Sequence, residues 1–144
     1  MAKASRNKTI DTPLSEGKMY LDRCITVTQN QSTLCHVVDK TILGDMLRVC
    51  PLLPPESVDL IVADPPYNLT KTFHETTFSK KKSADYENYT RQWLRAVKPL
   101  LKKTGSIYVC CDWETSLIVG NILSEFFHVR NRITWQREKG RGAK

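Results

Sequence analysis

The feature that most constrains this fold is an apolar run that ends at two consecutive prolines, VDLIVADPPYN at residues 58–68. The run is rich in β-branched residues, which is typical of a strand buried on both faces of a sheet. Pro65 and Pro66 remove two backbone donors and fix φ twice, so the strand must end before them. The sequence therefore predicts a buried strand at 58–63 and a rigid, extended exit at Asp64.

Strand and helix patterns alternate from residue 41 onward. Apolar runs predict further strands at 41–43, 106–111 and 129–135. Helical spacing predicts helices at 86–101 and 114–127, with the inward residues Trp93, Leu94, Val97, Leu101, Leu117, Ile118, Ile122, Leu123 and Phe126. Lys103-Thr104-Gly105 is predicted as a turn. The alternation indicates an α/β fold with a parallel sheet.

The remaining segments give the predicted domain organisation. Residues 1–16 are polar and predict a flexible basic tail, and residues 138–144 predict a basic, flexible end. Between them, 17–137 is expected to form a partial catalytic domain. Short strands or a hairpin are expected at 18–40, with a turn at Asn30-Gln31-Ser32. Residues 69–85 predict a long mobile loop, which we expect to lie as a lid at the carboxyl edge of the sheet.

Composition excludes several classes. The chain has 144 residues, 40% hydrophobic and 26% charged, which predicts one domain at most. We find no secretory signal and no apolar run of ~18 residues, so no membrane association is expected. The five cysteines lack paired zinc spacing, which predicts reduced thiols and no metal. The formal net charge of +7 is typical of a protein that meets phosphates.

The residues after the predicted strand suggest one particular chemistry. Ligands of open α/β sheets bind at the carboxyl edge, where residues 64–68 leave the strand. The Asp64 carboxylate and the Pro65 carbonyl offer two acceptors for the hydrogens of an exocyclic amine, which suits methyl transfer to that amine. Tyr67 offers a face for base stacking, worth ~1–3 kcal/mol. The alternative is an ordinary Asp-Pro turn with Tyr67 as a packed aromatic.

Asp64-Pro65-Pro66-Tyr67 resembles the catalytic motif of S-adenosylmethionine-dependent amino-methyltransferases that act on DNA. Residues 43–47 and 54–61 resemble the entry to that motif in the beta-class adenine-N6 enzymes of restriction–modification systems. Residues 103–109 and 133–135 are similar to the sheet of that family. The resemblance covers roughly residues 40 to 137.

The resemblance implies a Rossmann-like methyltransferase sheet that methylates N6 of a flipped-out adenine in double-stranded DNA, in the bacterial cytoplasm. The implied catalytic residues are Asp64, Pro65, Pro66 and Tyr67. The implied contacts to S-adenosylmethionine are Asp45, Met46, Asp64 and Pro65, where Asp45 is also a helix N-cap candidate. The candidate DNA contacts are Asn68, Lys71, Lys80, Lys81 and Lys82. Trp113 is a candidate for the base pocket.

Two features of the family are missing from the sequence. The beta-class resemblance implies a Phe-x-Gly-x-Gly-like cofactor loop and a target-recognition region, and none of the six glycines follows a strand in that pattern. We therefore expect an incomplete sheet that associates with a second copy or with a complementary methyltransferase half. The alternatives are cytosine-N4 methylation, whose enzymes more often carry Ser at the position of Asp64, RNA amine methylation, and a non-catalytic nucleic-acid-binding or assembly module.

Overall fold

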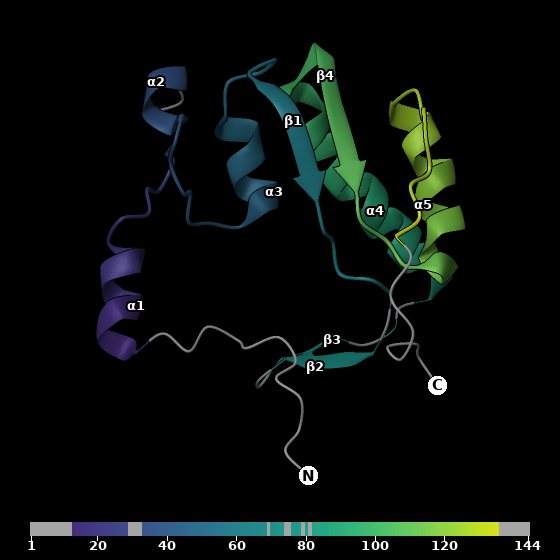
Figure 1. The fold of residues 1–144 in the computed structure, drawn as a ribbon, viewed down its shortest axis with the longest axis horizontal. Coiled ribbons are helices and arrows are strands. Elements are labelled where there is room, and N and C mark those ends of the chain that lie inside the picture. Colours follow the sequence, from purple (N-terminus) through teal and green to yellow (C-terminus); the bar gives the residue numbers. More distant parts are fainter. Residues whose placement is uncertain are drawn as a thin grey trace. The chain divides into compact units, whose positions relative to one another are not determined.

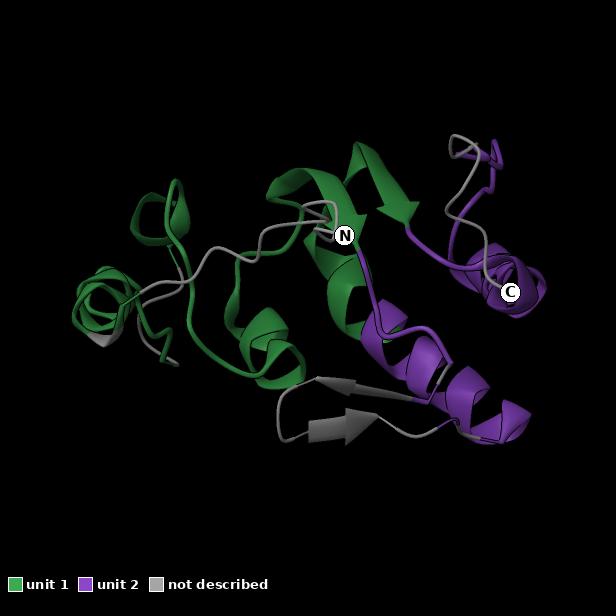
Figure 2. Ribbon diagram, turned by 60° about the horizontal axis from the view of Figure 1, so that its bottom comes forward, with its two compact units in different colours: residues 1–63, 95–109 green, residues 64–94, 110–144 purple. Residues whose placement is uncertain are grey.

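The computed structural model describes residues 13–28, 33–68, 70–73, 76–78, 80 and 82–135. The chain divides into two compact units, each described here by itself (Figure 2). The first unit comprises residues 1–63 and 95–109, and the second comprises residues 64–94 and 110–144.

Among the described residues, the two longest helices, α4 and α5, and the longest strand, β4, all lie after residue 58 (Figure 1). In chain order they are α1 (Leu14–Leu21), α2 (Leu34–Val37), α3 (Met46–Val49), the 3-10 helix η1 (Cys50–Leu52), β1 (Val58–Ala63), β2 (Lys71–Phe73), β3 (Thr76–Phe78), α4 (Ser83–Val97), the 3-10 helix η2 (Lys98–Leu100), β4 (Leu101–Val109) and α5 (Trp113–Phe126).

The first unit contains a parallel pair of strands, β1 and β4, which confirms the predicted strand at 58–63 and its parallel pairing. The predicted turn at 103–105 is wrong, because β4 continues through it. The strands instead accommodate these residues in a bulge: the partner of Val58 is Leu101, whereas the partner of Leu60 is Ser106. Gly105 permits this, since a Cβ there would lie 3.0 Å from the Asp59 carbonyl oxygen.

The prediction that β1 is buried on both faces is wrong. Leu60 and Val62 are 53% and 68% exposed, and Tyr108, the partner of Val62, is 53% exposed. Ile61 and its partner Ile107, on the opposite face, are partly buried. A parallel pair normally has both faces covered. Within the described residues, one face of this pair therefore presents apolar side chains to solvent.

The predicted strands or hairpin at 18–40 are also wrong. This region forms helices α1 and α2, and α1 begins at Leu14, inside the predicted tail. A single parallel bridge between Ile25 and Ile42 replaces the expected strand at 41–43. Helices close their own hydrogen bonds, whereas a strand needs a partner along its length. Residues 1–12 and the predicted turn at 30–32 lie outside the described residues.

Helices α4 and α5 supply the core of the second unit. The helix predicted at 86–101 begins earlier, at Ser83, and ends earlier, at Val97, where the 3-10 helix η2 that contains Pro99 follows. Trp93 and Leu94 are 3% and 0% exposed, which confirms the predicted inward face. In α5, the predicted inward position of Leu117 is wrong, since it is 69% exposed, and the buried positions include Val119 and Ile122.

Two other segments differ from their predictions. The predicted loop at 69–85 contains an antiparallel hairpin, in which β2 pairs with β3. The predicted strand at 129–135 is absent: these residues are described and form no regular element. Ile133 and Trp135 are 74% and 90% exposed, so this segment has no partner strand to cover them. No helix in the described part of the chain is long and apolar enough to cross a membrane.

Candidate active site

The motif Asp64-Pro65-Pro66-Tyr67 follows directly on β1 and has no regular secondary structure, as the double proline predicts. The Asp64 side chain is exposed, and Tyr67 is partly buried. Ala63, the last residue of β1, is paired with Val109, the last residue of β4. Residues 64 and 110 therefore leave two paired strands at the same end.

The pKa of Tyr67 is raised to about 12, first by burial and then by hydrogen bonding to Asp64 and the negative charge of that carboxylate. The phenol therefore keeps its proton at neutral pH, so it acts as a donor toward a carboxylate, which can only accept.

Two cysteines follow the end of β4. The strand was predicted to run to residue 111, which is wrong, because it ends at Val109. Cys110 is exposed, and Cys111 is partly buried. Burial, together with the charges of Asp112 and Cys110, raises the pKa of Cys111, and Arg132 opposes this effect.

Asp112 is the N-cap of α5, a structural role. Its Oδ1 accepts hydrogen bonds from the Thr115 backbone nitrogen at 2.7 Å and from Thr115 Oγ1 at 2.5 Å. Thr115 and Tyr86 are both buried, at 4% and 3% exposed. Burial raises the pKa of Tyr86. Trp113 is 81% exposed, so its role in a base pocket stays a prediction.

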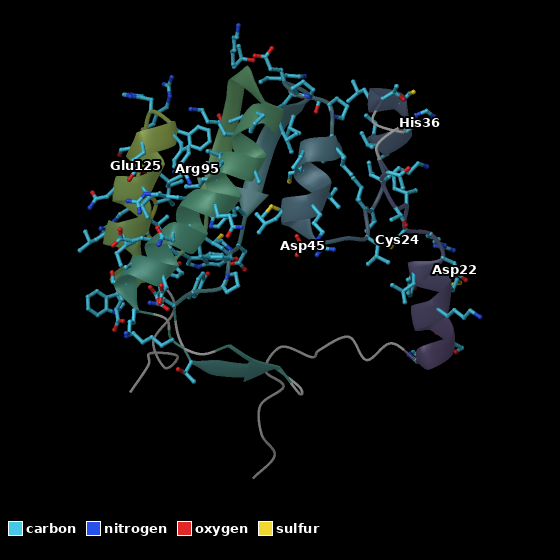
Figure 3. The ribbon with its side chains drawn as sticks, turned by 180° about the vertical axis from the view of Figure 1, so that it is seen from behind. Asp22, Cys24, His36, Asp45, Arg95 and Glu125 are labelled. Carbon is cyan, nitrogen blue, oxygen red and sulfur yellow. The ribbon has the colours of Figure 1, made fainter. Side chains whose placement is uncertain are left out.

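Asp45 lies in the first unit, at the start of α3 (Figure 3). Its Oδ1 accepts a hydrogen bond from the Arg48 backbone nitrogen at 3.2 Å, which confirms the predicted N-cap. The side chain is exposed, so its remaining lone pairs are accessible from solvent. The adjacent Met46 is 40% exposed. The cofactor contacts assigned to these two residues stay predictions.

The candidate DNA contacts are only partly described. Lys80 Nζ lies 3.5 Å from Glu114 Oε2, and both side chains are about half exposed, at 59% and 48%. Lys82 is exposed and Asn68 is partly buried. The backbone of Lys71 belongs to β2, whereas its side chain and the whole of Lys81 lie outside the described residues. None of the five roles is tested by these positions.

The cavity described here and a search for metal-binding groups add no residue to the candidate site. A cavity of about 190 Å³ in the first unit is lined by Ile25, Thr26, Val27, His36 and Val37, none of which was a predicted site residue. Among the described residues, no group of three or more His, Cys, Asp or Glu side chains is arranged to hold a metal ion.

Residues 58–144, which include the whole motif, match the family described as DNA methylase, the N6/N4 methyltransferases. The chain belongs to this DNA methylase family. It is 37% identical over 101 residues to "DNA adenine methyltransferase YhdJ" of Escherichia coli K12, an alignment that covers 67% of the chain and 33% of that relative. The predicted resemblance to adenine-N6 methyltransferases is thus confirmed.

A second relative gives the same picture. The chain is 33% identical over 112 residues to "Type II methyltransferase M.HinfI" of Haemophilus influenzae, with 67% of the chain and 31% of the relative covered. The chain therefore spans about a third of the length of these two curated relatives.

Proposed function

We propose that this chain supplies the catalytic-motif part of an S-adenosylmethionine-dependent enzyme that methylates N6 of adenine in double-stranded DNA. The observation that carries the proposal is the motif Asp64-Pro65-Pro66-Tyr67, which follows directly on a parallel strand and lies inside the stretch that matches the DNA methylase family. The similarity to a relative named as a DNA adenine methyltransferase favours adenine as the base.

The chemistry requires the amine to become a better nucleophile. The lone pair of an exocyclic adenine amine is delocalised into the ring, so two acceptors on its hydrogens would draw the nitrogen toward tetrahedral geometry. The exposed Asp64 carboxylate supplies one acceptor, and the Pro65 carbonyl supplies the other. Bound S-adenosylmethionine would supply the methyl group, and Asp64 and Pro65 would hold the amine nitrogen that receives it. Positioning, rather than a covalent enzyme intermediate, accounts for most of the rate.

The base must leave the duplex to reach Asp64, which costs a few kcal/mol. The Tyr67 ring offsets part of this cost by stacking on the flipped base. Pro65 and Pro66 hold both groups on a short, stiff segment, so little chain entropy is lost when the base binds. The amine itself attacks, so neither Cys110 nor Cys111 is needed as a nucleophile.

When bound, S-adenosylmethionine supplies an activated methyl group on sulfur. Asp45 fits the hydroxyl and ammonium groups of such a cofactor, because its exposed carboxylate keeps free lone pairs after capping α3. We assign Asp45 and Met46, with Asp64 and Pro65, as its contacts. The resemblance places the methionine-binding glycine loop in a part of the family that this sequence does not show.

The exposed apolar face of β1 and β4 supports a larger, Rossmann-like sheet. Leu60, Val62 and Tyr108 are each more than half exposed, and apolar patches of this kind favour association. The chain spans about a third of the curated relatives. The catalytic domain, assigned to 17–137, is therefore expected to be completed by a complementary methyltransferase half or by a second copy.

Contact with DNA would be electrostatic and nearly independent of sequence. The net charge is +7, and Lys80 and Lys82 are exposed beside the hairpin of β2 and β3. Together with Asn68, Lys71 and Lys81, they are the proposed contacts to phosphates. Both relatives come from bacteria, which supports the cytoplasm of a bacterium as the place of action.

Cytosine-N4 methylation is the second candidate, because the family includes N4 as well as N6 methyltransferases. One assay distinguishes N6 from N4 methylation by identifying the methylated nucleoside. The chain is incubated with methyl-labelled S-adenosylmethionine and unmethylated duplex DNA, both alone and together with the part of YhdJ that lies outside the match. The DNA is then digested to nucleosides. We expect label in N6-methyladenine, whereas label only in N4-methylcytosine would contradict the proposal.

A further inference from the structure

Lys80 links the hairpin of β2 and β3 to helix α5. Its backbone nitrogen donates a hydrogen bond to Thr70 Oγ1 at 3.0 Å, and its Nζ lies 3.5 Å from Glu114 Oε2 in an ion pair. All three residues belong to the second unit. The lysine to which the proposed function assigns a DNA phosphate is therefore already paired with a carboxylate of the same chain.

This ion pair is open to solvent on both sides. The side chains of Lys80 and Glu114 are 59% and 48% exposed. Exposed pairs of this kind contribute little, because water solvates both charges and the long side chains lose freedom when they are held. A lysine ammonium is also a compact charge on a flexible stem, which does not depend on one partner geometry. Another anion can therefore replace the Glu114 carboxylate at little cost.

A second ion pair of α5 differs in each of these respects. Arg91 bonds Glu125 through two guanidinium nitrogens, at 2.8 and 3.0 Å, and the Arg91 side chain is only 26% exposed. Two parallel bonds to one carboxylate are stronger and more specific in their geometry than one contact. The pair of Arg91 and Glu125 is thus suited to hold two helices together, whereas the pair of Lys80 and Glu114 is suited to exchange.

A DNA phosphate is the kind of anion that would exchange with Glu114. A duplex carries one negative charge per ~1.7 Å of its axis, and its phosphate oxygens accept from an ammonium as a carboxylate does. Glu114 lies in the first turn of α5, next to Trp113, which is 81% exposed, so this turn is accessible from solvent. A phosphate that approaches Lys80 must break the ion pair and also meets the negative charge of Glu114.

We propose that Glu114 is a built-in competitor for DNA phosphate, which holds Lys80 when no DNA is bound and weakens the contact that Lys80 makes with the duplex. This inference rests on the proposed function, which assigns Lys80 to a phosphate, and adds to it a residue that limits the affinity. Contacts to phosphates are independent of sequence, so a limit on their strength lets the protein leave DNA that lacks a target.

The first measurement is the affinity of the 144-residue chain for a short, fluorescein-labelled duplex, followed by fluorescence anisotropy. Glu114→Gln removes the charge and keeps the shape of the side chain. We expect its Kd to fall about two- to fivefold, the scale of one exposed ion pair. Because the expected result is a gain of affinity, loss of folding cannot imitate it. An unchanged or higher Kd would overturn the proposal.

Asp85→Asn is the matched control for the loss of one negative charge. Asp85 is an exposed acidic residue in the first turn of α4, as Glu114 is in the first turn of α5. Both substitutions therefore change the net charge of the second unit and the charge at a helix start in the same way. Asp85→Asn should change the Kd much less than Glu114→Gln. Equal tightening by the two variants would show an effect of net charge alone and overturn the competition.

A double-mutant cycle tests whether Glu114 acts through Lys80. Lys80→Gln should weaken DNA binding, because it removes the proposed contact to a phosphate. In the Lys80→Gln background, Glu114→Gln should lose most of its effect, since no ammonium is left to compete for. An undiminished effect in that background would show general repulsion between Glu114 and DNA, and would overturn the proposed role.

Salt gives a third, independent readout. Each phosphate neutralised by a lysine adds about 0.9 to the slope of log K against log salt concentration. Lys80→Gln should therefore lower this slope by up to about 0.9 in the Glu114→Gln background, and by less in the wild-type background. The advantage of Glu114→Gln should also shrink as salt screens the charges. An advantage that is constant with salt would contradict an electrostatic competition.

The outcomes separate this inference from the function on which it rests. If the wild-type preparation methylates adenine and Glu114→Gln binds DNA no more tightly, only the competition is overturned. If the cycle gives the predicted coupling and no adenine is methylated, the proposed function fails and the competition for DNA stands. If the chain does not bind the duplex at all, the proposed DNA contacts and the competition fail together.

Discussion

Arg91 on α4 holds Glu125 on α5 through two guanidinium nitrogens: Nε lies 3.0 Å from Oε2, and Nη2 lies 2.8 Å from Oε1. Nη1 of the same side chain lies 3.3 Å from Oε2 of Glu87. The bond to Glu125 is the main cause of the raised pKa of Arg91, so the guanidinium stays charged. This arrangement joins the two long helices of the second unit.

Because the Arg91 guanidinium forms two bonds to the Glu125 carboxylate, we expect that Arg91→Lys is not a conservative substitution. A lysine ammonium cannot form two parallel bonds to one carboxylate. We expect a small but measurable fall in the midpoint of thermal unfolding, because exposed ion pairs contribute little. Circular dichroism during heating measures it. Arg95 is an exposed arginine on the same helix, so Arg95→Lys is the control and should have no effect. Equal midpoints for both variants would contradict a stabilising role for the Arg91–Glu125 pair.

Asp112→Ala should lower the free energy of unfolding by about 1–2 kcal/mol, as for loss of a helix N-cap. It removes the acceptor of two Thr115 donors, and Thr115 is buried. Denaturant titration gives the value. The matched control is Asp45→Ala, which removes an exposed N-cap from the four-residue α3 and should cost less. A larger loss for Asp45→Ala would show that the cap of α5 is not the stronger one.

The cysteines should differ in their reaction with N-ethylmaleimide. Burial raises the pKa of the Cys50 and Cys111 thiols, so at a fixed pH near 7.5 a smaller fraction is thiolate, which is the reactive form. We expect these two to react at least about tenfold more slowly than the exposed Cys35 and Cys110, and to gain reactivity as the pH rises. Peptide mapping by mass spectrometry follows each site. Equal rates at Cys50 and Cys35 would contradict the burial.

The apolar face of the sheet should make the isolated chain associate. The double variant Leu60→Thr and Val62→Thr places a β-branched residue, which favours strands, at both positions and removes apolar surface from this face. Sedimentation velocity should show larger species for the wild type and a shift toward monomer for the variant. Leu117→Thr, at an exposed leucine on α5, should leave association unchanged. A monomeric wild-type chain would contradict this prediction.

The sequence predicted the elements that local chemistry determines. The end of β1 follows from Pro65 and Pro66, and the start of α3 follows from Asp45, which caps it. The site residues 64–67 could also be predicted, because they are consecutive residues that form a recognisable motif.

Features that depend on neighbours could not be read from the pattern. Leu60 and Val62 look buried in sequence, yet their exposure depends on what covers them. Residues 18–40 have the composition of strands, but a strand needs a partner, and the chain forms helices there. The bulge at residues 102–105 resembled a turn because Gly105 suits both.

The most direct test of the proposed active site compares Asp64→Ala with Asp59→Asn in the methylating preparation. Asp59 is an exposed aspartate on β1 whose carboxylate pairs with Lys102 at 2.8 Å, so it controls for loss of an acidic side chain nearby in the chain. Methyl transfer and DNA binding are measured on both variants. The account predicts that Asp64→Ala lowers adenine methylation by more than about a hundredfold and leaves DNA binding nearly intact. Asp59→Asn should change neither methylation nor DNA binding. Substantial N6-methyladenine formation by Asp64→Ala would contradict the role of this carboxylate.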